Sequence, residues 1–330
     1  MTLAPVCAIP RRELGSTGLH LSALGFGASP LGGVFQAIDD RAGVAAVHHA
    51  HARGINYFDT SPFYGATKSE SVLGQALRDL PRSEFVLSTK VGRYGQDSFD
   101  FSAARVTASV AESLQRLQVP YIDIILCHDV EFGDLHQVVN ETLPALHQLK
   151  SQGLVKHVGF SALPLNVFSW IIDKAPPGQV EVVLSYCHHS LNDSSLCDLL
   201  PYFESKGVGV IGASPMAMGL LTNQGPPAWH PAPAPLQQAC ANAAAHAAAQ
   251  GVDISKLALK HSVRLPGISS TLVGMASAEL VDTNIATTLQ ALGQQANENE
   301  AEESRVAAEV LGLLAPVQGV TWPSGKPLPC

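Results

Sequence analysis

Asp59-Thr-Ser-Pro-Phe-Tyr-Gly65 is the stretch of sequence from which the fold of this chain is deduced. It follows Ile55-Asn-Tyr-Phe58, a short apolar and aromatic run of the kind that forms β-strands. A carboxylate at the end of a predicted strand therefore precedes a loop that contains a proline and a tyrosine. Ordinary structural loops also carry these residues, so the interpretation depends on what ends the neighbouring strands.

The segments around this stretch alternate between short apolar runs and longer amphipathic ones. The apolar runs predict strands at residues 24–28, 55–58, 85–90, 121–128, 155–160, 180–186, 208–213 and 269–274. The amphipathic runs predict helices at residues 38–54, 69–80, 102–118, 135–152, 165–174, 195–206, 236–250, 255–264, 278–289 and 299–314. Strands that alternate with helices form a mostly parallel sheet, because parallel neighbours require a crossover connection.

Eight such units predict a closed (β/α)8 TIM barrel in a single domain, residues 1–330. An amino-terminal β-hairpin, with glycines at 15 and 18 in its turn, precedes it, and a proline-rich segment at 225–235 introduces extra helices and loops at the carboxyl-terminal side. The alternative, a doubly wound sheet, normally has a Gly-x-Gly-x-x-Gly turn after its first strand. Here Gly25-Phe-Gly27 is followed by Pro30, which favours the barrel.

The composition and net charge argue against two classes of binding partner. The 330 residues are 46% hydrophobic and 15% charged, which predicts a large buried core, and the net charge of −8 argues against nucleic acid or an anionic membrane as a partner. No apolar run approaches the ~20 residues of a membrane span, and no secretory signal is visible at residues 1–12. The six cysteines contain no Cys-x-x-Cys pair, so we expect free thiols in a reducing cytoplasm.

Four residues at predicted strand ends have complementary chemistry. The carboxyl ends of barrel strands form the active site, and this rule selects Asp59, Tyr64, Lys90 and His128. An ammonium beside a phenol favours the phenolate, and a carboxylate holds that ammonium in place. We therefore expect Tyr64 to act as general acid or base and His128 to orient the reacting oxygen. This set needs no metal or nucleophile, which fits hydride transfer to or from a nicotinamide.

With these four residues the chain resembles the aldo-keto reductase superfamily, whose catalytic Asp, Tyr, Lys and His match them one by one. The resemblance covers essentially the whole chain and, within the superfamily, is strongest to the L-galactose dehydrogenases of plants and algae. The stretches that carry it are Gly25-Phe-Gly-Ala-Ser-Pro-Leu-Gly32, Asp59–Gly65, Cys127-His-Asp129, Leu184-Ser-Tyr-Cys-His188, Ser214-Pro-Met-Ala-Met-Gly-Leu-Leu-Thr222, Gly225-Pro-Pro-Ala-Trp-His-Pro231 and Thr321-Trp-Pro-Ser-Gly325.

This resemblance implies NAD-dependent oxidation of L-galactose at C1 to L-galactono-lactone, an ascorbate precursor, with Tyr64 as general base. A related sugar or aldehyde oxidoreductase such as an L-fucose dehydrogenase, or a cofactor-binding subunit without turnover, remains an alternative. The implied partner is a small-molecule sugar, and a second copy of the chain is a further candidate.

The resemblance also implies where a dinucleotide binds. The pyrophosphate would lie against residues 214–221, and the adenosine end at the eighth strand and the start of the following helix, where free N–H groups suit an anion. Members that prefer NADP carry basic residues near 274–280, whereas this chain has none there and Glu279 would repel a 2′-phosphate, which predicts NAD. The implied cofactor-binding residues are Gly27, Ala28, Asp59, Ser161, Ser185, Ser214, Pro215, Met216, Gly219, Leu221, Gly274, Ala276 and Asn284.

Two positions depart from the superfamily pattern. Ser161 is followed by Ala162 rather than asparagine, and Ala213 stands where an aromatic residue commonly stacks on the nicotinamide. We therefore do not carry the superfamily's detailed contacts with the nicotinamide over to this chain. The candidate substrate contacts are Phe63, His128, His188 and Trp322, although packing alone also explains a tryptophan in such a loop.

Overall fold

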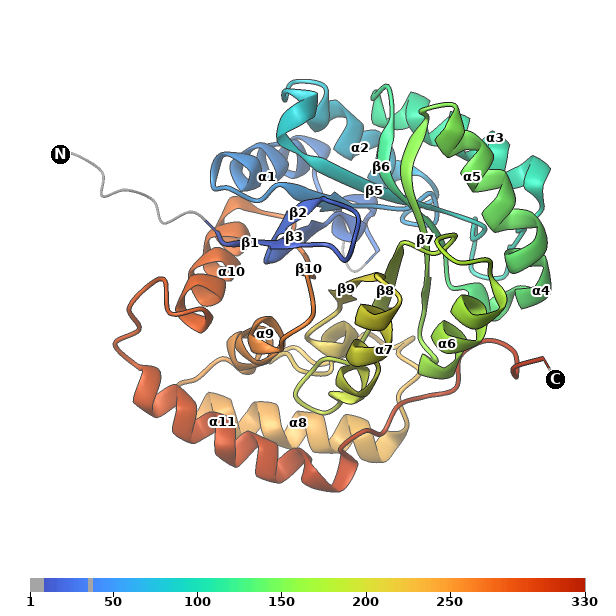
Figure 1. The fold of residues 1–330 in the computed structure, drawn as a ribbon. Helices are drawn as coiled ribbons and strands as arrows, with labels where there is room; N and C mark the ends of the chain where they lie inside the picture. Colours follow the sequence, from blue (N-terminus) through green and yellow to red (C-terminus); the bar gives the residue numbers. More distant parts are fainter. Residues whose placement is uncertain (1–8, 35–37, 330) are drawn as a thin grey trace.

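The eight predicted strands close into a parallel barrel, as the sequence predicts. The computed structural model describes residues 9–34 and 38–329 (Figure 1). Around the barrel the strands follow the order β10-β3-β4-β5-β6-β7-β8-β9, and every neighbouring pair is parallel. Their bounds are β3 (Leu24–Gly27), β4 (Tyr57–Asp59), β5 (Val86–Val91), β6 (Ile122–Cys127), β7 (Val155–Ala162), β8 (Val182–Tyr186), β9 (Gly209–Ala213) and β10 (Ser270–Gly274).

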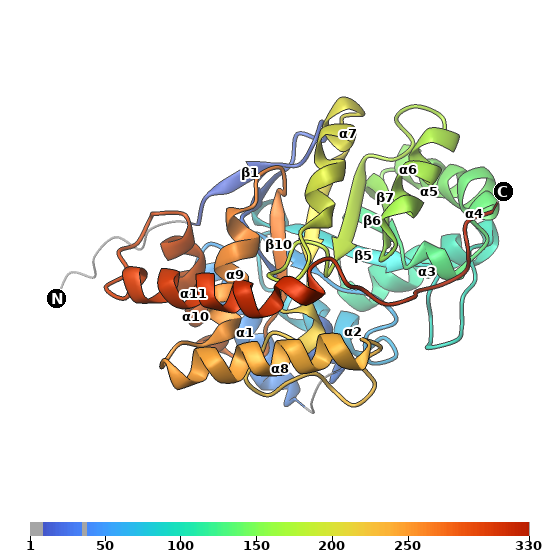
Figure 2. The same cartoon turned by 90° about the horizontal axis from the view of Figure 1, so that it is seen from below.

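Helices surround this barrel and cover its outer face (Figure 1). The helices that follow the strands are α1 (Asp40–Ala52), α2 (Lys68–Leu77), α3 (Ala103–Leu117), α4 (Leu135–Gln137), α5 (Leu143–Ser151), α6 (Leu165–Lys174), α7 (Leu200–Ser205), α9 (Ile254–Arg264) and α10 (Ala278–Ala291). Two further helices, α8 (Ala234–Ala249) and α11 (Glu300–Leu314), pack side by side outside this ring (Figures 1 and 2). No helix in the described ranges is long and apolar enough to cross a membrane.

Two predicted helices are interrupted. The helix predicted at 135–152 contains a π-helical turn, Val138–Thr142, between α4 and α5. The helix predicted at 195–206 begins as a 3-10 helix, Ser195–Leu199, and becomes α-helical only in α7. Each following α-helix has a proline in its first turn, where the missing N–H is tolerated. Because that proline cannot donate to the carbonyl four residues earlier, the preceding turn takes another hydrogen-bond pattern.

The amino-terminal hairpin closes one end of the barrel. Strands β1 (Arg11–Glu13) and β2 (His20–Ser22) pair antiparallel, and Leu14 and Leu21 are fully buried in the cluster that fills the barrel interior. The Arg12 guanidinium donates hydrogen bonds to the carbonyls of Ile268 (2.9 Å) and Val263 (2.8 Å), which precede β10. Since this end is plugged, the opening lies at the carboxyl ends of the strands.

The alternation of side chains along the strands decides which residues face that opening. In β5, Leu87 and Val91 pack outward in the core beneath the helices, so Ser88 and Lys90 point into the barrel. In β4 the same alternation puts Tyr57 and Asp59 inside. The structure extends β4 to Asp59, where the sequence predicts the strand to end one residue earlier.

Candidate active site

A buried ion pair forms the floor of the opening. Lys90 Nζ donates to Asp59 Oδ1 at 2.6 Å and to the Thr60 carbonyl at 2.9 Å, and Lys90 is only 1% exposed. The other carboxylate oxygen of Asp59 accepts from Ser88 Oγ at 2.6 Å. Burial lowers the pKa of Lys90, but Asp59 and Tyr64 raise it by more, so its net pKa lies above the ordinary value. Lys90 is therefore held as an ammonium.

Tyr64 reaches this ammonium from the loop after β4. Lys90 Nζ lies 5.0 Å from the centroid of the Tyr64 ring. The next residue, Gly65, has φ +63°, and a Cβ there would lie 2.1 Å from the Gly32 carbonyl oxygen, so this position requires glycine. The close backbone contact fixes the loop that carries Tyr64 against the loop after β3.

Burial favours the protonated form of the Tyr64 phenol. Burial raises the pKa of Tyr64, Lys90 opposes this, and Asp59 and Asp129 add to the rise, so the net pKa lies above the ordinary value. The sequence-based expectation considered only the neighbouring ammonium, which favours the phenolate. Tyr64 is therefore a neutral phenol in the protein alone. It is ready to donate a proton and needs further positive charge nearby to accept one.

His128 stands against the tyrosine as a neutral ring. The rings of Tyr64 and His128 are perpendicular, with centroids 5.7 Å apart, and Phe63 contacts the same imidazole edge-on at 5.9 Å. Burial lowers the pKa of His128 to about 3, although the nearby Asp129 acts in the opposite direction. A neutral imidazole can donate one hydrogen bond to a substrate oxygen without carrying charge. The phenol, ammonium and imidazole therefore lie next to one another at the opening, an arrangement suited to proton transfer at a bound oxygen.

A second polar group lies beside His128 that sequence reasoning did not assign. Asp129 forms an ion pair with Arg93, whose guanidinium lies 3.9 Å from the Phe63 ring centroid. Burial raises the pKa of Glu131 to about 7, with Asp129 adding to the rise. Tyr186 ends β8 and points inward beside Ala213, its register partner on β9. Asp129 and Tyr186 lie within stretches that carry the family resemblance, which is the signal that could have identified them.

The backbone after β9 suits an anionic group such as a pyrophosphate. Ser214, Ala217, Met218 and Gly219 all have positive φ, between 46° and 105°, which is rare for three non-glycine residues so close together. Successive backbone N–H groups in turns that combine right- and left-handed residues point to a common side and create an anion-binding concavity. Helix α10 begins nearby in the fold, after β10, with Ser277 as its N-cap. These segments therefore fit a dinucleotide in the predicted position.

The predicted cofactor residues differ in their position relative to the opening and in their burial. Gly27 and Gly274 are register partners on adjacent strands at the opening, where Ala28 follows β3 and Ala276 precedes α10. Ser161 is the second-last residue of β7 at the same end, and its hydroxyl accepts from the Asp129 amide at 3.0 Å. Ser185 instead shares the outer face of β8 with Val183, by strand alternation, and its buried hydroxyl has no partner among the described residues. Pro215 and Leu221 are buried, Met216 is partly exposed, and Asn284 is mostly buried on α10.

The predicted substrate contacts divide into two groups. Phe63 and His128 lie together at the opening. His188 and Trp322 instead line a cavity of about 500 Å³ under the carboxyl-terminal tail, which the four catalytic candidates do not line. His188 is buried and its Nδ1 bonds Asp193 at 2.8 Å, while Trp322 packs edge-on against His230. Tyr64 is not among the residues that line this cavity.

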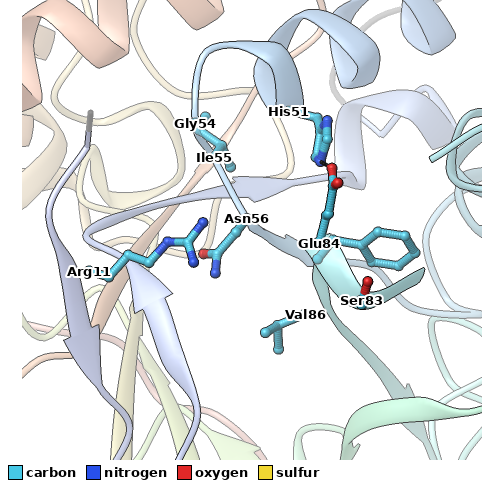
Figure 3. A pocket seen from close by; sticks show the side chains of 9 residues that line it. Arg11, His51, Gly54, Ile55, Asn56, Ser83, Glu84 and Val86 are labelled. Carbon is cyan, nitrogen blue, oxygen red and sulfur yellow. Dashed lines mark ion pairs between the residues drawn. The ribbon is translucent and has the colours of Figure 1, made fainter. Parts of the chain in front are cut away.

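Another cavity, of about 370 Å³, lies at the plugged end of the barrel. It is lined by Arg11 of the hairpin, by Asn56 before β4, and by His51 and Glu84, whose side chains face each other at 3.3 Å (Figure 3). Because it lies at the amino-terminal end of the strands, it is separate from the opening that holds Tyr64.

Comparisons with known proteins agree with this geometry. The model of the aldo/keto reductase family matches residues 23–299. The L-galactose dehydrogenase of Arabidopsis thaliana is 52% identical over 321 residues, covering 96% of this chain and 98% of that protein. The D-arabinose 1-dehydrogenase of Saccharomyces cerevisiae is 33% identical over 245 residues, covering 71% and 72%. Among solved structures, the holo form of aldo-keto reductase AKR11C1 from Bacillus halodurans is similar with a TM-score of 0.69 and 26% identity, covering 92% and 96%.

Proposed function

The chain belongs to the aldo/keto reductase family, whose members use a nicotinamide cofactor, and on this basis we propose that it is an NAD-dependent L-galactose 1-dehydrogenase. The observation that carries the proposal is the full-length similarity to the Arabidopsis enzyme together with a complete Asp59, Tyr64, Lys90 and His128 group at one opening. The reaction would convert L-galactose to L-galactono-lactone, a precursor of ascorbate. The free thiols of the described cysteines are compatible with a cytoplasmic location.

Each residue has a separate task in this reaction. A bound oxidised nicotinamide would supply a hydride acceptor and a positive charge. Tyr64 accepts the proton of the C1 hydroxyl, Lys90 stabilises the phenolate, and Asp59 holds Lys90 in place. His128 donates a hydrogen bond to the C1 oxygen and orients it. The hydride and the proton leave C1 and its hydroxyl, so that the C1–oxygen bond becomes a carbonyl.

The preference for NAD follows from charge around the adenosine end. No Lys or Arg occurs from Gly274 to Leu280, and Glu279 is exposed in the first turn of α10. His49 on α1 and Arg53, which directly follows this helix, are both ion-paired with Asp282 on α10. A 2′-phosphate would therefore meet a carboxylate without a free cation from this segment.

A steady-state assay of the purified protein tests the proposal. We expect rapid NAD reduction with L-galactose, much slower reduction with NADP, and much weaker turnover of D-galactose. L-Fucose and D-arabinose belong in the same panel, because a higher kcat/KM for either sugar would assign the enzyme to that related activity. Negligible turnover with all of them, combined with tight NAD binding and co-purification with a larger partner, would favour a cofactor-binding subunit instead.

Tyr64→Phe tests the chemical step. We expect kcat to fall about 10³-fold with NAD affinity nearly unchanged, because only the proton-transferring oxygen is lost. Tyr202→Phe is a matched control, since its hydroxyl donates to Asp173 on the protein surface. Retained turnover in Tyr64→Phe would remove Tyr64 from its proposed role.

A further inference from the structure

Ser61 connects the tyrosine loop to the catalytic histidine. Ser61 is fully buried, and its Oγ lies 3.0 Å from His128 Nδ1. The same oxygen accepts a hydrogen bond from the Phe63 amide at 3.1 Å, and the Ser61 carbonyl accepts from the Tyr64 amide at 3.1 Å. One residue therefore closes the turn that presents Tyr64 and contacts the ring of His128.

The hydrogen-bonding capacity of the Ser61 hydroxyl determines which group donates in its contact with His128 Nδ1. A serine hydroxyl has one proton to donate and two lone pairs to accept with. Because the Phe63 amide uses one lone pair, the proton of Ser61 is available for His128 Nδ1. If Nδ1 carried a proton instead, the buried Ser61 proton would have no acceptor within hydrogen-bond distance among the described residues. The arrangement therefore favours a lone pair on Nδ1.

The other side of the ring points to the same tautomer. His128 Nε2 lies 3.6 Å from Asp129 Oδ2, and that carboxylate is held as an ion pair by Arg93. A protonated Nε2 is attracted to a carboxylate, whereas a lone pair on Nε2 would be repelled by it. Two independent contacts, one at each ring nitrogen, thus favour the form with its proton on Nε2.

We propose that Ser61 is a positioning residue that fixes His128 as the Nε2–H tautomer, so that this N–H is presented to the oxygen of the substrate. The inference rests on the proposed function for the identity of that oxygen, the C1 hydroxyl. It does not require Ser61 to touch the substrate. Its role is to keep the donor facing the opening while the same turn holds Tyr64.

The test compares wild type with Ser61→Ala by long-range 1H–15N correlation spectroscopy of the histidine rings. His128→Asn assigns the His128 signals. We expect wild type to show an unprotonated Nδ1, and Ser61→Ala to show a mixture of tautomers or a proton on Nδ1. In steady-state kinetics, kcat should fall about 10- to 100-fold, while the Kd for NAD from fluorescence titration stays within twofold.

Ser262→Ala is the matched control, because it removes another fully buried serine hydroxyl, which donates to the backbone carbonyl of His189. It should leave the His128 signals and kcat unchanged. A protonated Nδ1 in wild type, or unchanged His128 signals in a folded Ser61→Ala, would overturn the inference. The spectra need no substrate, so a failure of L-galactose turnover would refute the proposed function and leave the assignment of Ser61 to be decided separately.

Discussion

Replacing Asp59 with asparagine tests the electrostatic design of the opening most directly. The substitution keeps the shape of the side chain and removes its charge 2.6 Å from Lys90 Nζ. The amide oxygen can still accept from Lys90, and the Thr60 carbonyl at 2.9 Å is unaffected. The amide nitrogen would then donate to Ser88, whose hydroxyl donates to Asp59 in the native chain. Only charge and the direction of one hydrogen bond change.

The size of the effect follows from the distance. At an effective dielectric constant of about 20, two unit charges at this separation attract by about 6 kcal/mol before desolvation is counted. Breaking a buried pair from one side typically costs about 3–5 kcal/mol of folding free energy. Burial lowers the pKa of Lys90 and Asp59 raises it, so the pKa of Lys90 should fall in the variant. A fraction of the enzyme then loses the ammonium that supports Tyr64, and kcat should fall about 10²-fold or more.

The assay measures kcat with L-galactose and NAD between about pH 6 and pH 10. We expect the loss to be largest at high pH, because the alkaline limb moves to lower pH when Lys90 deprotonates more easily. Asp173→Asn is the control, since it removes a carboxylate that pairs with Lys206 at 3.0 Å on the surface. A folded Asp59→Asn enzyme with native kcat and an unchanged pH profile would refute the assigned role of the ion pair.

Three further predictions concern stability, the tail and cofactor choice. Glu131→Gln should raise the free energy of unfolding at pH 8 by up to about 3 kcal/mol and change it little at pH 5. Burial raises the pKa of Glu131 to about 7, so the native wild-type protein loses stability as the pH rises toward that value. A difference in denaturation midpoint between variant and wild type that is the same at both pH values would contradict this. Gly325→Ala should release the tail and lower the free energy of unfolding by about 1–3 kcal/mol, because φ is +69° and a Cβ would lie 2.3 Å from the Glu131 carbonyl oxygen. A red shift in the fluorescence of Trp322 would report the release. Gly319→Ala is the control, since Gly319 also has positive φ but its Cβ would meet no close contact. Glu279→Arg should improve kcat/KM for NADP severalfold at low ionic strength and less at high salt, and an NADP rate that does not respond to salt would argue against charge as the cause.

The barrel and its catalytic candidates were predictable because their signals are local. Strand–helix alternation and the carboxyl-end rule need only short stretches of sequence, and they placed Asp59, Lys90 and His128 correctly at the opening. The breaks before Pro144 and Pro201 also had a local signal, the prolines themselves.

The contacts that tune the site were not predictable in this way. Ser61 and His128 are 67 positions apart, and Glu131 and Ser324 are 193 apart, so their pairing depends on barrel register and on the path of the tail. The pKa of Tyr64 was misjudged for a related reason. A sequence shows that an ammonium is near, but the desolvation that outweighs it is known only once the fold is known.

The hairpin that closes the barrel has a consequence for synthesis on the ribosome. Its residues emerge before those of the barrel, yet the Ser16 amide donates to the Gly207 carbonyl at 3.0 Å and the Arg12 guanidinium donates to the carbonyls of Val263 and Ile268, all of which are made much later. Such contacts, separated by 191 to 256 positions, are slow to form. Leu14 and Leu21 must therefore stay unburied until most of the chain has been translated, and during that interval a chaperone or a neighbouring nascent chain can bind them. The hairpin is synthesised before the residues that hold it in place, and it can pack only after they are made.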